Sequence, residues 1–203
     1  MVLLIVPMIL VSPTEIPRAI SHLQNGGVVV YPTESSYGIG CMASNVAAVA
    51  RVFALKQRPF EKILPLIIGS VDEAKRLIVW SPVAEKLATE YWPGPLTIVA
   101  PATAVGRWLA PGILAPDGTI ALRISPHPVA RALVDAVGPI ILTSANLSGA
   151  PACFDVSSVK SWIGNAEDVM AIDAGALPRD LPSTIVRITD TGYEILRKGQ
   201  AVV

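Results

Sequence analysis

Three clusters of polar side chains follow apolar segments of the sequence, and their residue types could recognise a small charged ligand. The first, residues 33–37, carries four hydroxyl groups and one carboxyl group. The second places Lys56, Arg58 and Lys62 close together beside a proline, and the third, residues 143–149, reads TSANLSG. Cationic side chains bind phosphates, whereas hydroxyl and amide groups bind small polar groups. Together the clusters indicate a nucleotide pocket that lacks a phosphate-binding glycine loop.

Each cluster also has an ordinary structural explanation. Hydroxyl and Asn side chains are common in turns and at helix caps. Lys56 and Arg58 could simply end a helix, where cations are favourable. The positions of the clusters nevertheless favour a single shared site, because each cluster follows a predicted strand or helix. Arg123 and Arg197 add two further cations near the ends of predicted strands.

The elements that position these clusters can be predicted from capping patterns and apolar spacing. Helices are expected at 13–25, 44–56, from 70 onward, 81–91 and 128–137. Strands are expected at 28–31, 63–68, 96–100, 119–124, 139–143, 168–173, 183–188 and 193–198, with the last two antiparallel. Helices and strands alternate early and strands crowd late, which predicts an α/β fold with a twisted mixed parallel/antiparallel sheet and helices on its faces. In such sheets ligands bind outside the carboxyl ends of the strands.

Composition narrows the class of protein. The chain has 203 residues, 52% of them apolar, which suits one α/β domain spanning 1–203. Lys and Arg together number 16, and Asp and Glu together also number 16. The net charge is therefore zero, which disfavours a positive potential over the whole surface that would attract nucleic acid. Cys41 and Cys153 have no metal-site spacing, so a reducing, cytoplasmic setting is expected. The apolar extension at 1–12 lacks a signal-peptide pattern, is too short to span a membrane, and is predicted to be a strand.

Competing motifs are missing or lack the required context. The sequence contains neither G-x-x-x-x-G-K-[ST] nor G-x-S-x-G. GIGCMA at 38–43 fits G-x-G-x-x-A, but six residues separate it from its strand, and Glu61 precedes a strand instead of ending one. His22 and His127 have no obvious partner for a nucleophile. Carboxylates are too scattered to predict a protein metal site, although a nucleotide could carry Mg²⁺.

The motifs in their order resemble the threonylcarbamoyl-AMP synthase family, which has the YrdC-like fold. The resemblance is carried by YPTESSYGIG, LKQRPFEK, YWPGPLT, ALRISPHPVA, TSANLSG and ILRKGQ, and it covers roughly residues 15–200. The length resembles the short form of the family. The implied fold is a single YrdC-like domain with an open cationic cavity.

The resemblance implies an enzyme that makes L-threonylcarbamoyladenylate and diphosphate from ATP, L-threonine and bicarbonate. The product would serve the N6-threonylcarbamoyl modification of adenosine 37 in tRNA, through a downstream tRNA threonylcarbamoyl transferase complex, with weak tRNA binding possible and no membrane partner. By motif match, the expected ATP contacts are Lys56, Arg58, Lys62, Thr119, Asn146 and Arg197. The expected threonine contacts are Thr33, Arg123, Ser144 and Ser183.

Elementary chemistry agrees with this implication. A carbamate oxygen must attack the α-phosphorus of ATP, so two anions must meet. Fixed cations and in-line positioning can lower that barrier, and Lys56 and Arg58 are expected to act electrostatically without a covalent nucleophile. Arg123 could hold the carboxylate of the amino acid. The hydroxyl-rich segment would recognise the small substrate, and Gly38 and Gly40 would let the backbone approach it.

Two alternatives remain open at the level of sequence. An RNA-binding accessory protein would use the same cations to hold a nucleic acid, although zero net charge and only three Phe residues disfavour it. A relative that handles carbamoyl phosphate is chemically closer. The sequence also departs from longer family members, many of which carry a histidine near the position of Ile67.

Overall fold

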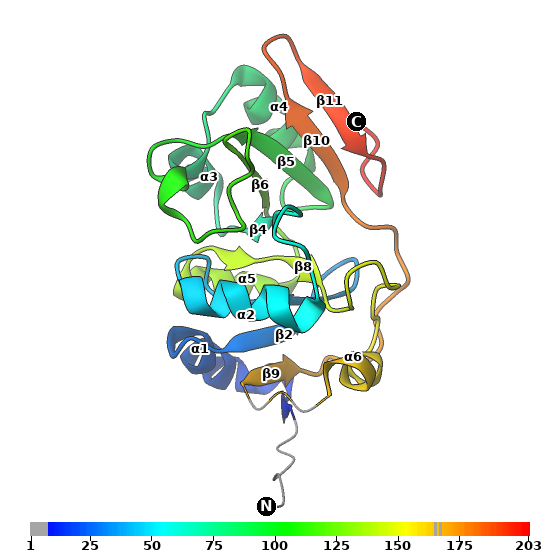
Figure 1. Cartoon of the computed structure of the whole chain (residues 1–203). Helices are drawn as coiled ribbons and strands as arrows, with labels where there is room; N and C mark the ends of the chain where they lie inside the picture. The colour runs from blue at the N-terminus through cyan, green and yellow to red at the C-terminus, as the bar shows by residue number, and fades with distance from the viewer. Residues whose placement is uncertain (1–7, 165, 167) are drawn as a thin grey trace, which may run out of the picture.

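The computed structural model describes residues 8–164, 166 and 168–203, which form an α/β fold with two mixed sheets (Figure 1). The five-stranded sheet has the order β1-β9-β2-β3-β8. Its strands are β1 (Ile9–Val11), β2 (Val28–Pro32), β3 (Tyr37–Gly40), β8 (Thr143–Ser144) and β9 (Val169–Ile172). The α/β class and the mixed strand directions are confirmed, but the expectation of one sheet is wrong.

The six-stranded sheet has the order β11-β10-β5-β6-β4-β7. Its strands are β4 (Leu66–Ile67), β5 (Leu96–Pro101), β6 (Thr119–Arg123), β7 (Ile140–Ile141), β10 (Thr184–Ile188) and β11 (Tyr193–Arg197). The strands β10 and β11 are antiparallel neighbours, as predicted. In Figure 1 this sheet lies in the upper half of the molecule with α3 and α4, and the five-stranded sheet lies below it.

Local signals placed most helices correctly. The helices are α1 (Ile16–Gln24), α2 (Val46–Lys56), α3 (Val71–Leu77), α4 (Pro82–Tyr91), α5 (Pro128–Val137) and α6 (Val156–Ile163). A 3₁₀ turn, Pro13–Glu15, precedes α1, and the Glu15 carboxylate accepts the backbone N–H of Ser12 at 2.9 Å. The sequence analysis did not predict α6, whose N-cap Asp155 accepts the backbone N–H of Ser158 at 2.7 Å. No helix in the described part of the chain is long and apolar enough to cross a membrane.

The described part of the apolar N-terminal extension is a strand, as predicted. Within it, β1 pairs in parallel with β9, with Ile9 opposite Met170 and Val11 opposite Ile172. Residues 1–7 of the extension lie outside the described residues.

The hydroxyl-rich segment is the turn of a hairpin. No predicted strand covers 37–40, but β3 turns back there and pairs antiparallel with β2. A Cβ atom added at Gly40 would lie 1.9 Å from the backbone oxygen of Ile141. Gly40 is therefore required where two backbones meet, and its role in letting the chain approach a substrate stays a prediction.

The strand predicted at 139–143 is divided between the two sheets. Its first part, β7, pairs with β4 in the six-stranded sheet, and its second part, β8, pairs with β3 in the five-stranded sheet. Leu142 is the residue between them. Because the chain crosses from one sheet to the other here, the TSAN segment that follows lies at the junction of the two sheets.

The two faces of the six-stranded sheet have different roles. Successive side chains of a strand point to opposite faces. One face sends apolar side chains, among them Ile98, Leu122 and Val186, into the main hydrophobic core. The alternate residues, among them Thr97 and Arg123, face the second sheet. This face therefore brings polar and charged side chains to the space between the two sheets.

Candidate active site

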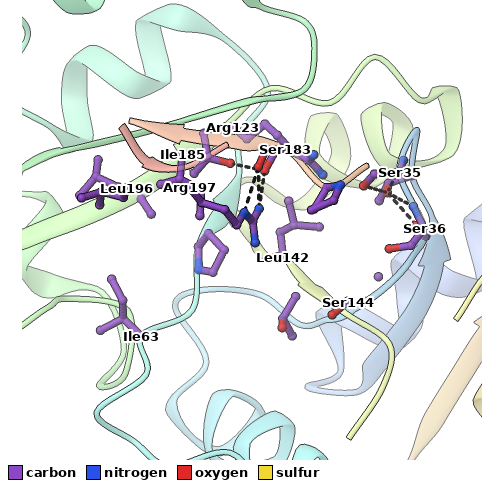
Figure 2. Close-up of a pocket in the computed structure, with 18 of the residues that line it drawn as sticks. Ser35, Ser36, Ile63, Arg123, Leu142, Ser144, Ser183, Ile185, Leu196 and Arg197 are labelled. Carbon is purple, nitrogen blue, oxygen red and sulfur yellow. Dashed lines mark hydrogen bonds between the residues drawn. The ribbon is translucent and has the colours of Figure 1, made fainter. Parts of the chain in front are cut away.

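A cavity of about 740 Å³ lies between the two sheets (Figure 2). Its walls come from β3, β8 and the β2–β3 turn on one side, and from β5, β6, β10 and β11 on the other. The volume falls in the range of small-molecule and cofactor sites. The cavity is the structural counterpart of the predicted site.

Seven of the ten predicted site residues line this cavity. They are Thr33, Arg58, Thr119, Arg123, Ser144, Ser183 and Arg197. Lys56, Lys62 and Asn146 are not among the described residues that line it. The structure thus brings together side chains from five separate parts of the chain, and it places the remaining three close to the cavity wall through their chain neighbours.

Arg123 is buried and paired with a carboxylate. Its Nη1 lies 2.6 Å from Oε1 of Glu34, and its side chain is only 2% exposed. The other oxygen of Glu34 accepts the hydroxyl of Ser125 at 2.6 Å. Burial lowers the pKa of the Arg123 guanidinium, and the charge of Glu34 opposes that shift. Glu34 therefore links the hairpin turn of one sheet to the end of β6 in the other.

Arg197 and Arg58 differ from Arg123, because no carboxylate lies within ion-pair distance of either in the described part of the chain. Arg197 donates to the backbone oxygen of Ser183 at 2.7 and 3.1 Å and to its hydroxyl at 3.1 Å (Figure 2). Arg58 donates to the backbone oxygens of Lys62 and Ile63 at 2.7 and 3.0 Å. Burial lowers the pKa of each, and the nearby charge of Arg123 also lowers that of Arg197. Both guanidiniums keep an uncompensated positive charge at the cavity.

Hydroxyl groups at the cavity are held by neighbouring groups. The Thr33 hydroxyl donates to the backbone oxygen of Ser36 at 2.7 Å, which closes the hairpin turn. The hydroxyls of Thr97 and Ser183 lie 2.9 Å apart and link β5 to the start of β10. The Thr119 hydroxyl donates to Oδ1 of Asp117 at 2.6 Å. These bonds fix the hydroxyl oxygens before any ligand binds.

Lys56 lies beneath the cavity wall. It is the last residue of α2, it is 1% exposed, and its Nζ donates to the backbone oxygens of Ser144 and Asn146 at 2.5 Å each. Asn146 donates its side-chain amide to the backbone oxygens of Leu147 and Ala150 at 2.8 and 2.7 Å. In this structure Lys56 orders the TSAN segment, and direct contact of Lys56, Lys62 or Asn146 with a nucleotide stays a prediction.

The burial of Lys56 predicts a specific pH dependence of stability. Burial and the charge of Arg58 lower the pKa of Lys56 from 10.5 to about 8. Between these values the unfolded chain binds the proton and the folded protein does not, so the contribution of Lys56 to the free energy of unfolding should rise from pH 8 to 10.5. Urea unfolding of the wild type and Lys56→Met at several pH values should show the stability of the wild type rising relative to that of the variant over this range. A parallel pH dependence in both proteins would contradict the prediction.

Asp117 and Arg187 are cavity residues that the sequence analysis missed. Oδ2 of Asp117 lies 3.1 Å from Nη2 of Arg187, and both side chains line the cavity. Arg187 could have been found, because Ser183, Ile185 and Arg187 alternate along a predicted strand and so share one face. Asp117 lies in a loop that approaches Arg187 only in the tertiary structure.

Ile67 occupies a buried position beside Arg123. It lies opposite Arg123 in the parallel pairing of β4 and β6, and it is fully buried. It packs in an apolar cluster with Tyr31, Val129 and Ile140, among others. Where many longer family members carry a histidine, this chain therefore has an apolar side chain next to the guanidinium of Arg123.

The chain was compared with known families, sequences and structures. A family model for Sua5, YciO and YrdC proteins, described as "Telomere recombination", matches residues 21–199. A threonylcarbamoyl-AMP synthase of Vibrio parahaemolyticus is 38% identical over 188 residues, covering 90% of this chain and 97% of the relative. The Escherichia coli K12 protein of the same name is 39% identical over 189 residues, covering 91% and 95%.

Solved structures agree with the sequence comparisons. The P. abyssi Sua5 structure, described as complexed with L-threonine, matches with a TM-score of 0.84 and 31% identity. The match covers 96% of this chain but only 57% of the Sua5 chain. E. coli YciO matches with a TM-score of 0.80 and 26% identity, covering 95% and 94%. The chain therefore belongs to the Sua5/YciO/YrdC family.

Proposed function

We propose that this protein is a threonylcarbamoyl-AMP synthase, a nucleotidyltransferase that forms L-threonylcarbamoyladenylate and diphosphate from ATP, L-threonine and bicarbonate. The observation that carries the proposal is the pair of uncompensated cations, Arg58 and Arg197, on the same cavity as the carboxylate-paired Arg123. The names of the relatives point to the same reaction.

The arrangement of charges suits the proposed substrates. A triphosphate needs positive charge that no protein carboxylate already neutralises, which Arg58 and Arg197 provide. Arg123 would take the carboxylate of threonine, with hydroxyls of Thr33, Ser144 and Ser183 near its polar groups. Lys56 and Asn146 would hold the TSAN segment against the phosphates, and Lys62 would lie nearby.

The chemical step requires positioning and electrostatic support. The amino group of threonine attacks the carbon of bicarbonate, water leaves to give a carbamate, and a carbamate oxygen attacks the α-phosphorus. The bond between the α-phosphorus and its bridging oxygen breaks, and diphosphate leaves with the electron pair. Arg58 and Arg197 would stabilise the charge that develops on the phosphate oxygens. The described residues hold no group of three or more His, Cys, Asp or Glu side chains suited to a metal, so Mg²⁺ would enter bound to the nucleotide.

The product would pass to a tRNA threonylcarbamoyl transferase complex in the cytoplasm, as the family resemblance implies. Weak direct binding of tRNA is part of the same proposal and rests on that resemblance alone.

The proposal is tested by measuring diphosphate release from ATP with bicarbonate, with and without L-threonine. We expect release to depend on threonine and an adenylate product to appear by mass spectrometry. Release that needs carbamoyl phosphate in place of threonine would instead support the carbamoyl-phosphate alternative. If the protein binds tRNA with steep salt dependence but neither binds nor hydrolyses ATP, the synthase proposal is wrong.

A further inference from the structure

The four arginines that line the cavity fall into two kinds. Arg58 and Arg197 have no carboxylate partner among the described residues, whereas Arg123 pairs with Glu34 and Arg187 pairs with Asp117. An arginine beside a carboxylate presents both donors and an acceptor to a ligand, so it is suited to a ligand that carries an acceptor beside a donor more than to a phosphate. The Arg187–Asp117 pair has no role in the proposed chemistry.

Strand register places this pair away from the reacting end of the cavity. One row of neighbouring residues crosses four strands of the six-stranded sheet. It contains Arg197 on β11, Ile185 on β10, Thr97 on β5 and Arg123 on β6. Arg187 lies further along β10, opposite Val99. Asp117 holds Thr119, at the start of β6, which lies about 13 Å along the strand from Arg123 at ~3.3 Å per residue. If the phosphates of a nucleotide lie between Arg58 and Arg197, its nucleoside must lie in another part of the cavity. The end of the cavity beside Asp117 and Arg187 can hold it.

The hydrogen bonds around Asp117 and Arg187 determine which of their atoms can still contact a ligand. Oδ1 of Asp117 accepts the backbone N–H and the hydroxyl of Thr119 at 3.1 and 2.6 Å. These bonds lower the pKa of Asp117, so the carboxylate is ionised and accepts only. Oδ2 faces Arg187 and keeps a free lone pair, because each carboxylate oxygen can accept about two hydrogen bonds. Nε of Arg187 is buried without a hydrogen-bond partner in the described part of the chain.

We propose that Asp117 and Arg187 read the base of the nucleotide and set its preference for adenine, an inference that rests on the proposed function. Adenine presents an amino donor next to a ring-nitrogen acceptor. Oδ2 of Asp117 accepts the amino group, and the Arg187 guanidinium donates to the adjacent ring nitrogen. Guanine and hypoxanthine carry a carbonyl oxygen where adenine has its amino group, and an ionised carboxylate repels that oxygen.

The test is the Asp117→Asn variant, assayed with ATP and with inosine triphosphate, which differs from ATP in having the carbonyl. The variant keeps the shape of the side chain but removes the negative charge that repels the carbonyl oxygen of the base. We expect the ratio of kcat/KM for ATP to that for inosine triphosphate to fall about tenfold, with KM for threonine unchanged within twofold. Asp190→Asn, in the β10–β11 turn outside the cavity lining, is the matched control and should keep the wild-type ratio.

Calorimetric binding of ATP and of inosine triphosphate without threonine gives the same ratio independently of activity. If the wild type shows no threonine-dependent diphosphate release, the proposed function is wrong. The ratio of ATP affinity to inosine triphosphate affinity would still test the role of Asp117 and Arg187. An ATP-to-inosine ratio unchanged within twofold in Asp117→Asn, or an equal loss for both nucleotides, overturns it. A changed preference between ATP and 2′-deoxyATP, with the base preference intact, also overturns it by assigning Asp117 to the sugar.

Discussion

Replacing Arg58 by Ala should lower kcat/KM for diphosphate release by about 30- to 1,000-fold, equivalent to roughly 2–4 kcal/mol of transition-state stabilisation. Arg58 lines the cavity, and among the described residues its guanidinium donates only to the backbone oxygens of Lys62 and Ile63. Its charge is therefore free to meet the charge that develops on the phosphate. The measurement is steady-state diphosphate release under saturating bicarbonate.

The matched control for this variant is Arg76→Ala. The Arg76 side chain is 72% exposed on α3 and lies outside the cavity lining. This control should keep kcat/KM within twofold of the wild type, and thermal unfolding should show that Arg58→Ala remains folded. Near-normal activity of folded Arg58→Ala would remove the phosphate role from Arg58.

Replacing Arg123 by Met should lower the free energy of unfolding by about 3–5 kcal/mol, because removing one partner of a buried ion pair leaves the other charge uncompensated. Here the uncompensated group is Glu34, whose side chain is 16% exposed and keeps the hydroxyl of Ser125 as a hydrogen-bond partner. Urea unfolding measures this loss. Threonine-dependent diphosphate release should also disappear, since no guanidinium remains for the carboxylate of the amino acid.

The double variant Arg123→Met with Glu34→Gln separates the two effects. Removing the second charge should restore at least half of the lost stability, as expected for coupled partners. It should not restore the use of threonine, because Arg123 is still missing. A double variant with a normal KM for threonine would show that Arg123 acts only in folding.

The sequence by itself determined the local structure and the residue types of the candidate site. The helices that begin near Ser12, Ser70 and Ser81 could be predicted. Their caps and the spacing of their apolar residues depend on contacts within a few residues. The helix α6 was missed although Asp155 caps it and Val156, Val159 and Ile163 follow at helical spacing, because an eight-residue helix contains few repeats of that spacing. Seven of the ten predicted site residues do line one cavity, but this cavity lies between two sheets and not at the carboxyl ends of the strands, since Thr119 begins β6 and Ser183 precedes β10.

Tertiary structure decided how the strands are shared and which charges are compensated. A single apolar run at 139–143 gives no sign that Leu142 divides it between two sheets, because strand partners are chosen by long-range packing. The same limit applies to the arginines. Nothing in the sequence near Arg58, Arg123 or Arg187 shows which of them meets a carboxylate, because Glu34 and Asp117 reach Arg123 and Arg187 only when distant segments fold together.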